Sequence, residues 1–455
     1  MSVSHLLAGF GRSNITPSLA VPHAGWGAQT HVLADGVHRE LYVDVLLLEQ
    51  KRADAEVACA LVSFDLVGLY GLEPAIQAAV ARETGLAADA VIVTVTHNHA
   101  NPVVWENWIG SRPEQVAAYR ASLPDAAAGA ARAAKLSLRP VRAKSAFGRC
   151  TIGRNRRQRV LDRDGSQRIV VGRDDAGVSD PDVLVWRLDE LDGTPYSAVL
   201  GYTCHPTTLG PDNRLHSPDY PGVAKAVFEA ATGASCLFLQ GAAGNVGPLH
   251  GFTGDVAVVE RLGSVLGLEA ARTYAEIDSR PVDLVYQHTR ESGASLAIWE
   301  ERPRPDVPAA LRLTHGRVML PLRPQPPIEE VDAHYRAMQA ELARVMSDGS
   351  AAELVEATMF RARRAQMAQR RARLHGGLQS VELDIWALVF GELALALCNG
   401  EPFCEIGLAI KRASPFANTF FGGYTGASIG YIPWPEAYPQ GGYAVETTPF
   451  LPEAA

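Results

Sequence analysis

The sequence predicts a mixed α/β protein in which one domain fills residues 1–455 and a pair of long helices is inserted at about residues 328–376. Two strand–helix–strand patterns in the first part of the chain predict a sheet that contains parallel strand pairs. Strand patterns resume from Val381, after the two helices. This return indicates that the helices interrupt one domain and do not link two.

The first strand–helix–strand unit precedes a pair of histidines. Val57–Leu66 is a short apolar run that predicts a strand. Glu73–Glu83 has helical spacing, with Pro74 in its first turn and Gly85 just beyond its end. Ala90–Thr96 is rich in β-branched residues, the composition of a fully buried strand. Together these segments predict a βαβ unit with a parallel strand pair.

A second unit follows the same order. Tyr196–Thr203 predicts a strand, and the turn-rich segment Gly210–Gly222 leads into a helix at about Val223–Ala231. Cys236–Gln240 predicts a further strand that ends at the Gly-rich loop Gly241–Pro248. In sheets with parallel strands, binding residues gather at the carboxyl ends of the strands. The loops at these ends are therefore the first places to look for a site.

The later part of the chain predicts the helical pair. Residues 302–327 are proline-rich and are interpreted as a connector. Ile328–Met346 and Ala351–Leu374 have the length and pattern of two helices, and the second carries many arginines. A solvated helix face is the favoured interpretation of those arginines, with a partner-binding face as the alternative.

Composition excludes several classes of partner. Lysine and arginine number 42 against 50 acidic residues, giving a net charge of −8, and no basic tract indicates nucleic acid or anionic lipid. The N-terminal segment does not resemble a secretory signal, and no stretch approaches the ~20 apolar residues of a membrane span. The six cysteines form no CxxC pair. Scattered thiols favour a reducing, cytoplasmic environment. The sequence leaves homo-oligomerisation open.

The pair His97 and His99 stands at the end of the first unit. On a strand, residues two apart point to the same side, so both imidazoles are expected to converge on a metal or an acid/base site. One structural and one surface histidine is an equally weighted alternative. Metallo-β-lactamase-type enzymes also carry His-x-His, but Asn101 and Pro102 stand where they have aspartate and histidine. The amidohydrolase barrels require eight βα repeats, which this chain does not show.

Two further candidates lie far along the chain. His205 ends the second predicted strand, as His97 ends the first, and this favours a ligand. Its neighbour Cys204 is expected to be a buried, inert thiol. Glu401 follows the apolar run Leu393–Leu397 and precedes a helix-like run at Phe403–Arg412. From the residues alone, Glu401 is favoured as a charge complement to that helix N-terminus.

Three weaker features remain. The Gly-rich loop Gly241–Pro248 can offer backbone N–H groups to an oxyanion, but such loops are common after strands. Arg154, Arg156 and Arg157 can clamp an anionic group of a substrate, although a solvated turn is slightly favoured. Tyr431, in a Gly-rich tail, is an ordinary amphipathic tyrosine when it is considered alone.

The ordered set of these segments is more specific than any one of them. In chain order the segments are Gly9-Phe10-Gly11 through Ile15-Thr16-Pro17, Thr96-His97-Asn98-His99, Asn155-Arg156-Arg157, Tyr202 through Gly210, Gln240 through Asn245, Gly400-Glu401-Pro402-Phe403, and Ile429-Gly430-Tyr431 through Gly442-Tyr443. Taken together they resemble the neutral ceramidases (the neutral/alkaline non-lysosomal ceramidase family) and their shorter bacterial relatives. The resemblance spans the catalytic domain of that family almost from end to end.

The resemblance implies a metal site with one Zn²⁺ ion per chain. The implied ligands are His97, His205, Glu401 and Tyr431, with Tyr424 as an alternative to the tyrosine. Four ligands far apart in sequence suit an enzyme site better than a zinc finger, whose ligands cluster.

The resemblance also implies the roles of the surrounding residues. His99 is expected to contact the scissile carbonyl, and His99, Glu401 and Tyr431 form the catalytic set. Arg156 is expected to anchor the substrate, with Gly244 and Asn245 of the Gly-rich loop as further substrate contacts.

Two departures from the family pattern set ceramide itself aside in favour of a smaller substrate. Gly247 replaces the serine of the family's Gly-Asp-Val-Ser-Pro loop, and we expect no C-terminal immunoglobulin-like domain. The predicted function is zinc-dependent hydrolysis of an amide (N-acyl) bond in a small or amphiphilic substrate by metal-activated water. An ester or lactone hydrolase is the first alternative, and a non-catalytic metal-binding interaction protein is the second.

Overall fold

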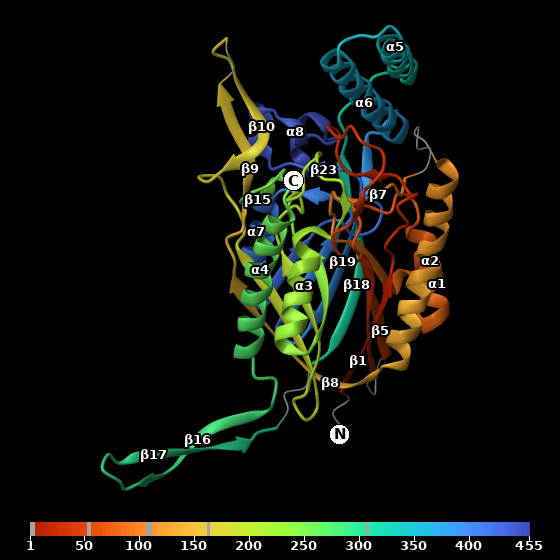
Figure 1. Ribbon diagram of the computed structural model, residues 1–455. Coiled ribbons are helices and arrows are strands. Elements are labelled where there is room, and N and C mark those ends of the chain that lie inside the picture. The colour runs from red at the N-terminus through yellow and green to blue at the C-terminus, as the bar shows by residue number, and fades with distance from the viewer. Residues whose placement is uncertain (1–4, 52–55, 106–111, 162–163, 306–308) are drawn as a thin grey trace.

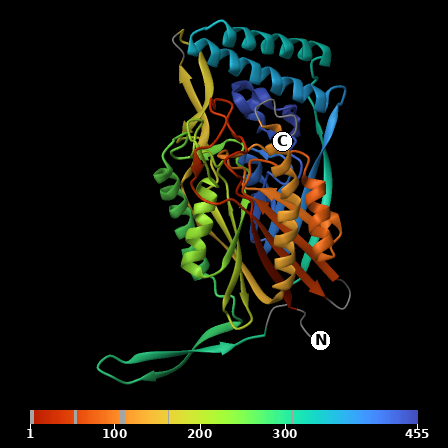
Figure 2. The same ribbon diagram turned by 45° about the vertical axis from the view of Figure 1, so that its right-hand side comes forward.

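The structure is a computed structural model that describes residues 5–51, 56–105, 112–161, 164–305 and 309–455. An eight-stranded sheet forms its middle layer (Figures 1 and 2). Helices pack on one face of this sheet, and a four-stranded sheet packs on the other face. The predicted mixed α/β fold class is confirmed. No immunoglobulin-like sandwich is present in these residue ranges.

The large sheet is mixed, with its parallel strands at the two ends. In spatial order its strands are β14 (Ser235–Gln240), β12 (Pro195–Tyr202), β11 (Asp182–Glu190), β8 (Arg139–Arg149), β1 (Leu6–Asn14), β4 (Tyr42–Lys51), β5 (Glu56–Phe64) and β6 (Val91–Val95). The pairs β12–β14 and β5–β6 are parallel, and the pairs between them are antiparallel. Both parallel strand pairs belong to the strand–helix–strand units that the sequence predicts.

Four helices cover one face of this sheet. They are α1 (Glu73–Thr84), α2 (Pro113–Leu136), α3 (Asp219–Thr232) and α4 (Val256–Glu276). Helix α1 matches its prediction: it ends at Thr84, and Gly85 follows in the left-handed region with a φ of 82°. Helix α3 begins at Asp219, inside the segment predicted as turn-rich. Together α1–α4 bury the apolar side of both sheet halves.

The second sheet packs on the opposite face of the first. Its strands are β18 (Leu311–Pro321), β19 (Ser380–Phe390), β20 (Leu393–Cys398) and β22 (Asn418–Gly422), and α7 (Cys404–Ala413) connects the last two. Leucine and aromatic side chains of both sheets share one buried cluster. The prediction that residues 302–327 are only a connector is wrong, because β18 lies within them.

The predicted helical pair is confirmed as α5 (Ile328–Ser347) and α6 (Ala352–His375). It lies between β18 and β19, which pair antiparallel with Pro321 opposite Ser380, so the helices extend from one end of a strand pair. Arg361, Arg364, Arg370 and Arg373 of α6 are exposed, as the sequence favoured, but two other arginines contact the body of the protein. Arg363 donates to the carbonyls of Gly27 and Gln29, and Arg371 donates to that of Thr447.

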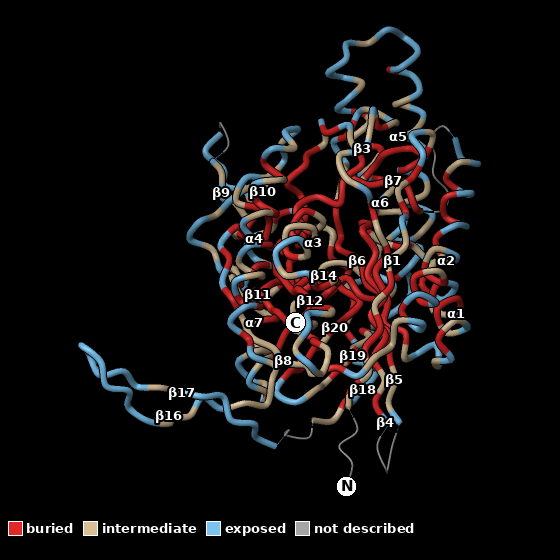
Figure 3. Tube along the Cα trace, turned by 60° about the horizontal axis from the view of Figure 1, so that its bottom comes forward, coloured by how far each residue is buried: buried red, intermediate tan, exposed pale blue. Residues whose placement is uncertain are grey.

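Further strands, most of them short, lie in the loop layer at the end of the molecule near the helical pair. They are β2 (His23–Ala24), β3 (Gly36–Val37), β7 (Asn101–Pro102), β9 (Gly153–Leu161), β10 (Gln167–Asp174), β13 (Leu215–His216), β15 (Val246–Pro248), β21 (Glu401–Pro402) and β23 (Tyr431–Ile432), with the short helix α8 (Tyr443–Thr447). At the opposite end β16 (Val282–Arg290) and β17 (Leu296–Pro303) form an exposed ribbon that projects from the body (Figure 3). Among the described helices, none has both the length and the apolar character that a membrane crossing requires.

The two ends of the large sheet approach each other. Ser63 Oγ of β5 donates to the carbonyl of Phe238 in β14 at 2.8 Å. Residues 422–425 then bridge both ends, because Gly422 pairs with Gly241 after β14 and Thr425 pairs with Thr94 of β6. We call this contact, between β14 and α3 on one side and β4–β6 on the other, the seam. The seam brings the loops after β6, β12 and β14 to one place.

The glycines of β1 allow a close approach of helix α2. A Cβ built on Gly9 would lie 2.0 Å from the carbonyl oxygen of Ala134, and one on Gly11 would lie 2.0 Å from that of Ala130. Both obstacles are backbone atoms, which cannot move aside as a flexible side chain can. This contact gives the Gly9-Phe10-Gly11 segment a structural role.

Replacing Gly11 should therefore destabilise the fold. We expect Gly11→Ala to lower the free energy of unfolding by about 1–3 kcal/mol, because overpacking forces the helix away from the sheet. Gly316 of β18 is the control, since a Cβ there meets nothing within 4 Å. Gly316→Ala should change the free energy by less than about 0.5 kcal/mol. Urea denaturation measures both, and equal free energies for the two variants would contradict the interpretation.

Candidate metal site

The residues expected as metal ligands come together at the end of the seam. His97 follows β6, His205 follows β12, Glu401 lies on β21, and Tyr431 lies opposite Glu401 on β23. The Nε2 atoms of His97 and His205 lie 3.6 Å and 3.9 Å from the same oxygen of Glu401, Oε2. Two ligand atoms of a tetrahedral zinc ion are separated by about 3.4 Å. The spacing therefore fits a shared cation.

His99 joins the two other histidines. One ring nitrogen from each of His97, His99 and His205 lies within 4.8 Å of the others, which makes this trio the only such group of metal-binding side chains in the described ranges. The ring centroids of His97 and His205 are 4.7 Å apart and nearly perpendicular. His99 is therefore placed either to bind a metal ion itself or to contact a substrate at that ion.

Backbone carbonyls fix the orientation of all three rings. Each Nδ1 faces one carbonyl oxygen, at 2.6 Å between His97 and Val67, 2.7 Å between His99 and Gly25, and 3.0 Å between His205 and Ala243. A carbonyl oxygen only accepts hydrogen bonds, so each Nδ1 carries the proton. Each neutral ring therefore keeps its lone pair on Nε2, the atom that a metal ion requires.

His97 reaches this position from a loop and not from a strand. Strand β6 ends at Val95, and His97 has a φ of 64°, in the left-handed region that non-glycine residues rarely adopt. Its backbone N–H donates to the carbonyl of Leu66 at 2.9 Å. The expectation that strand periodicity aligns His97 and His99 is therefore wrong. The convergence comes from a strained turn that the neighbouring chain holds in place.

Burial determines the charge of the site. It lowers the pKa of His97 and of His205 well below the ordinary value, and it lowers that of His99 to about 4. Burial also raises the pKa of Glu401 to about 7, although Arg156 and a hydrogen bond from Tyr431 act in the opposite direction. Neutral imidazoles beside this buried carboxyl group supply the nitrogen and oxygen ligands that a divalent cation can use.

Three acceptor atoms at the centre have no hydrogen-bond partner among the described residues. They are Nε2 of His99, Nε2 of His205 and Oε2 of Glu401, and all three are buried. Leaving such an atom unsatisfied costs roughly 1–3 kcal/mol. A divalent ion held by these side chains would satisfy several of them at once. The residues therefore fit a metal ion of the kind that nitrogen and oxygen ligands bind.

The two candidate tyrosines occupy different sides of the histidines. The hydroxyl of Tyr424 lies 3.2 Å from Nδ1 of His205, on the edge of the ring that faces away from Glu401. The hydroxyl of Tyr431 accepts a hydrogen bond from Nη2 of Arg156 at 3.0 Å and is hydrogen-bonded to Glu401. Tyr431 is therefore bonded to Glu401, whereas Tyr424 contacts the Nδ1 edge of His205.

Arg156 lies inside the protein, where the sequence slightly favoured a solvated turn. It stands on β9 with 6% of its surface exposed. Its guanidinium donates to the carbonyl of Gly244 from Nη2 at 2.8 Å and from Nε at 3.2 Å, in addition to its bond to Tyr431. A buried guanidinium next to Glu401 supplies the fixed positive charge of the site.

In the Gly-rich loop, Gly244 and Asn245 make structural hydrogen bonds. The N–H of Gly244 donates to the carbonyl of Pro402 at 2.9 Å, so it is not free to bind an oxyanion. The side chain of Asn245 accepts from the N–H of Cys404 at 2.8 Å and donates to Glu405 at 2.7 Å. Both residues therefore hold Arg156 and the start of α7 in place.

Gly247 leaves room for a side chain. A Cβ built there would lie 3.4 Å from Cβ of Arg156 and 3.9 Å from Oγ1 of Thr207, both ordinary contacts. The position that the serine of the resembled family would occupy is therefore beside Arg156.

Two residues near the site were not found from the sequence. Gly25, with a φ of 142°, supplies the carbonyl for His99, and a Cβ on it would lie 2.1 Å from the carbonyl oxygen of His99. The ring of the adjacent Trp26 packs on His99 at 5.1 Å. A glycine next to a tryptophan is the only sequence feature there, and it does not distinguish a site from an ordinary turn.

The fold and the site define a class of mixed α/β proteins with a buried histidine cluster that can hold a metal ion. The structure of neutral ceramidase from Pseudomonas aeruginosa matches the structure of this chain with a TM-score of 0.65 and 17% sequence identity. The match covers 100% of this chain and 72% of the ceramidase chain. A structure of ceramidase complexed with C2 matches with a TM-score of 0.63 and 17% identity, over 99% and 73%. The chain therefore has a neutral ceramidase-like fold, as its motifs predict. Comparison of the sequence with protein-family models and with curated proteins finds no match.

Metal binding at this cluster should stabilise the protein measurably. When zinc chloride is added to chelator-treated protein at 100 times Kd, we expect a gain of about 2.7 kcal/mol, because the ion binds only the folded chain. His205→Ala should lose most of this gain, whereas His250→Ala, which removes an exposed histidine, should keep it. Thermal unfolding with and without zinc measures the effect. An equal gain in the His205 variant and in wild type would refute the assignment.

Proposed function

We propose that this protein is a zinc-dependent hydrolase that cleaves an amide (N-acyl) bond of a small or amphiphilic substrate. The observation that carries the proposal is the convergence of three oriented imidazoles and a buried carboxylate in a neutral ceramidase-like fold. We further propose that residues 1–455 form one catalytic domain, because the two sheets share a core. All six cysteines are buried free thiols, which supports a reducing, cytoplasmic setting.

The proposed ligands of one zinc ion are His97, His205, Glu401 and Tyr431. The distances from both Nε2 atoms to Oε2 of Glu401 support the first three. The hydrogen bond between Tyr431 and Glu401 supports Tyr431 over Tyr424. When bound, zinc supplies Lewis acidity, which polarises a carbonyl group and lowers the pKa of a water molecule to about 7.

Two further residues of the site are proposed to transfer a proton and to stabilise the oxyanion. His99 carries its proton on Nδ1, so its Nε2 can accept a proton from the attacking water and later return it to the leaving amine. Before the attack, the same tautomer leaves Nε2 of His99 without a proton to donate to the substrate carbonyl. Because the N–H of Gly244 is also occupied, Arg156 becomes the proposed donor that stabilises the oxyanion and anchors the substrate.

The chemistry proceeds without an acyl-enzyme in this proposal. Gly247 offers no nucleophile where the resembled family has a serine, and Cys204, the thiol beside His205, is fully buried with a pKa well above its usual value because of burial. Direct attack by water is therefore favoured. An ester or lactone would suit the same groups, since only the leaving atom differs, and a non-catalytic metal-binding role would leave the site bound but inactive.

Substrate turnover separates these alternatives. We expect wild-type protein to hydrolyse at least one N-acyl compound faster than its matched ester, to lose turnover with a chelator, and to regain it with zinc. His97→Ala should lose about one zinc per chain and at least ~100-fold in kcat/KM. Metal analysis and a panel of paired amides and esters measure this. Bound zinc without chelator-sensitive turnover would favour the interaction protein, and unchanged metal in the variant would remove His97 from the site.

Two adjacent arginines provide a matched test of the substrate anchor. Arg156 points to Tyr431, whereas Arg157 points to the other side of β9 and donates to the carbonyls of Ala437 and Gly441. We expect Arg156→Met to lower kcat/KM about 100-fold or more, because an oxyanion donor is lost. Arg157→Met should stay within about threefold of wild type. Similar losses in both variants would show that Arg156 acts only through folding.

A further inference from the structure

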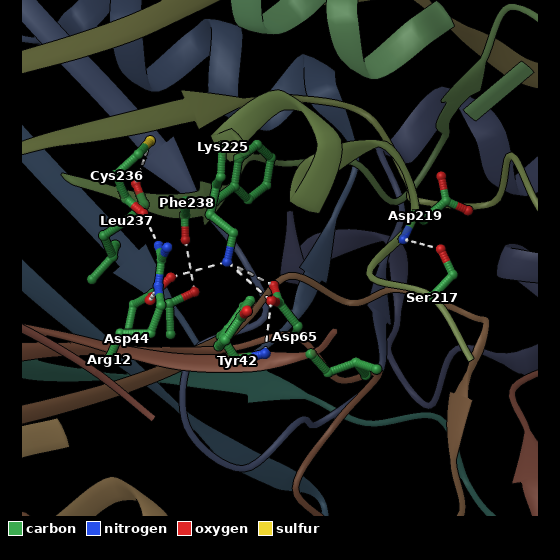
Figure 4. Close-up of polar contacts among 12 residues, drawn as sticks. Arg12, Tyr42, Asp44, Asp65, Ser217, Asp219, Lys225, Cys236, Leu237 and Phe238 are labelled. Atoms are coloured by element: carbon green, nitrogen blue, oxygen red, sulfur yellow. Dashed lines mark hydrogen bonds and ion pairs between the residues drawn. The ribbon is translucent and has the colours of Figure 1, made fainter. Parts of the chain in front are cut away.

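A fully buried lysine lies in the seam, outside the site. Lys225 of α3 is 3% exposed, and its Nζ lies 2.9 Å from Asp44 of β4 (Figure 4). The same nitrogen lies 3.0 Å from each carboxylate oxygen of Asp65, the residue that follows β5 by one position. Lys225 therefore bridges the helix on one side of the seam to two carboxylates on the other.

Asp65 is held at both its backbone and its side chain. Its N–H donates to the carbonyl of Tyr42 at 2.9 Å, and its carboxylate accepts from the N–H of Tyr42 at 3.0 Å (Figure 4). The contact with Lys225 fixes the rest of the carboxylate. The start of the loop after β5 is thus anchored to β4 and to α3 at the same time.

The next two residues of this loop hold His97. The carbonyl of Leu66 accepts from the N–H of His97 at 2.9 Å, and the carbonyl of Val67 accepts from its Nδ1 at 2.6 Å. These bonds keep His97 in its left-handed conformation and place the lone pair of its ring on Nε2. A shift of Asp65 would therefore move both acceptors of His97.

We propose that Lys225 is a positioning residue of the metal site, which acts through Asp65 to hold the carbonyl oxygens of Leu66 and Val67 that orient His97. The role rests on the proposed metal binding by His97. It differs from a general stabilising role, because a buried ion pair is often no more stabilising than apolar residues of the same size. A precise contact to the loop that carries a ligand gives the buried charge a function.

The charge of Lys225 is secured by its neighbours. Burial alone would lower its pKa, but Asp44 and Asp65 outweigh burial and raise that pKa above its ordinary value. Arg12 contributes a second cation to the network. It lies 2.5 Å from Asp44 and 2.8 Å from Glu229. The ammonium group thus remains charged between its two carboxylates.

Arg12 provides a matched control. Its guanidinium contacts Asp44, Glu229 and the carbonyl of Cys236 at 3.1 Å, and none of these residues holds His97. Removal of either cation breaks the same buried network, but only Lys225 contacts Asp65. The two variants therefore separate positioning of the ligand from loss of network charge.

The experiment compares Lys225→Met and Arg12→Met with wild type in the full chain. Both variants should lower the thermal midpoint. Zinc affinity, measured by competition with a chromogenic chelator on metal-free protein, should fall about 10–100-fold in Lys225→Met, the loss typical when support for a metal ligand is removed. In Arg12→Met it should change by less than about threefold.

The results test the positioning role of Lys225 separately from the proposed metal site. If wild type binds zinc and Lys225→Met binds it equally, or if Arg12→Met loses as much affinity, the positioning role is refuted while the metal site stands. If wild type binds no zinc, the proposed function fails, and the positioning role fails with it. Should Lys225→Met not fold, Asp65→Asn replaces it, because asparagine keeps an acceptor for Tyr42 but loses the charge. Wild-type zinc affinity in that variant would refute the role equally well.

Discussion

The closure of the large sheet at the seam is the constraint on which the site depends. Strands β12 and β6 are separated by five other strands in the sheet order, and in a flat sheet their ends would lie roughly 29 Å apart. The rings of His205 and His97, which follow these strands, are 4.7 Å apart. The sheet can achieve this only by curling until its ends meet. The polar contacts of Lys225 and Ser63 across the seam therefore support the geometry of the site as well as the fold.

Three residues next to the seam have strained backbone conformations. His97, Asp219 and Tyr424 all have positive φ values, of 64°, 52° and 60°, although none is a glycine. Such conformations cost of order 1–3 kcal/mol each and persist only when the surroundings determine them. Here the N–H of His97 is held by Leu66, that of Tyr424 by Gly400, and the carboxylate of Asp219 accepts from Leu209. Hydrogen bonds with neighbouring segments thus hold these three residues in strained conformations.

The sequence predicts those parts that depend on local patterns. The β-branched run before His97 and the long helical patterns of α5 and α6 each carry their own periodicity, and the ordered motifs identify the fold despite 17% identity to solved relatives. The order of the strands and the curl of the sheet are non-local, so neither the left-handed turn at His97 nor the seam could be read from the residues. The Gly-rich loop shows the same limit. Its glycines indicate free N–H groups, but the fold places the carbonyl of Pro402 where it accepts a hydrogen bond from the N–H of Gly244.

The arrangement of protons at the site gives the strongest physical reason for a cation. Three carbonyl oxygens take the Nδ1 protons of the histidines, so every Nε2 presents a lone pair to the same small volume. Oε2 of Glu401 adds a fourth acceptor there, and burial raises the pKa of this carboxyl group to about 7. Arg156 is directed to Tyr431 and Gly244 and does not donate to these atoms. Acceptors that face one another repel, and a divalent ion between them converts this repulsion into attraction. The three backbone carbonyls that turn the Nε2 lone pairs toward one another are thus the same groups that prepare the site for a metal ion.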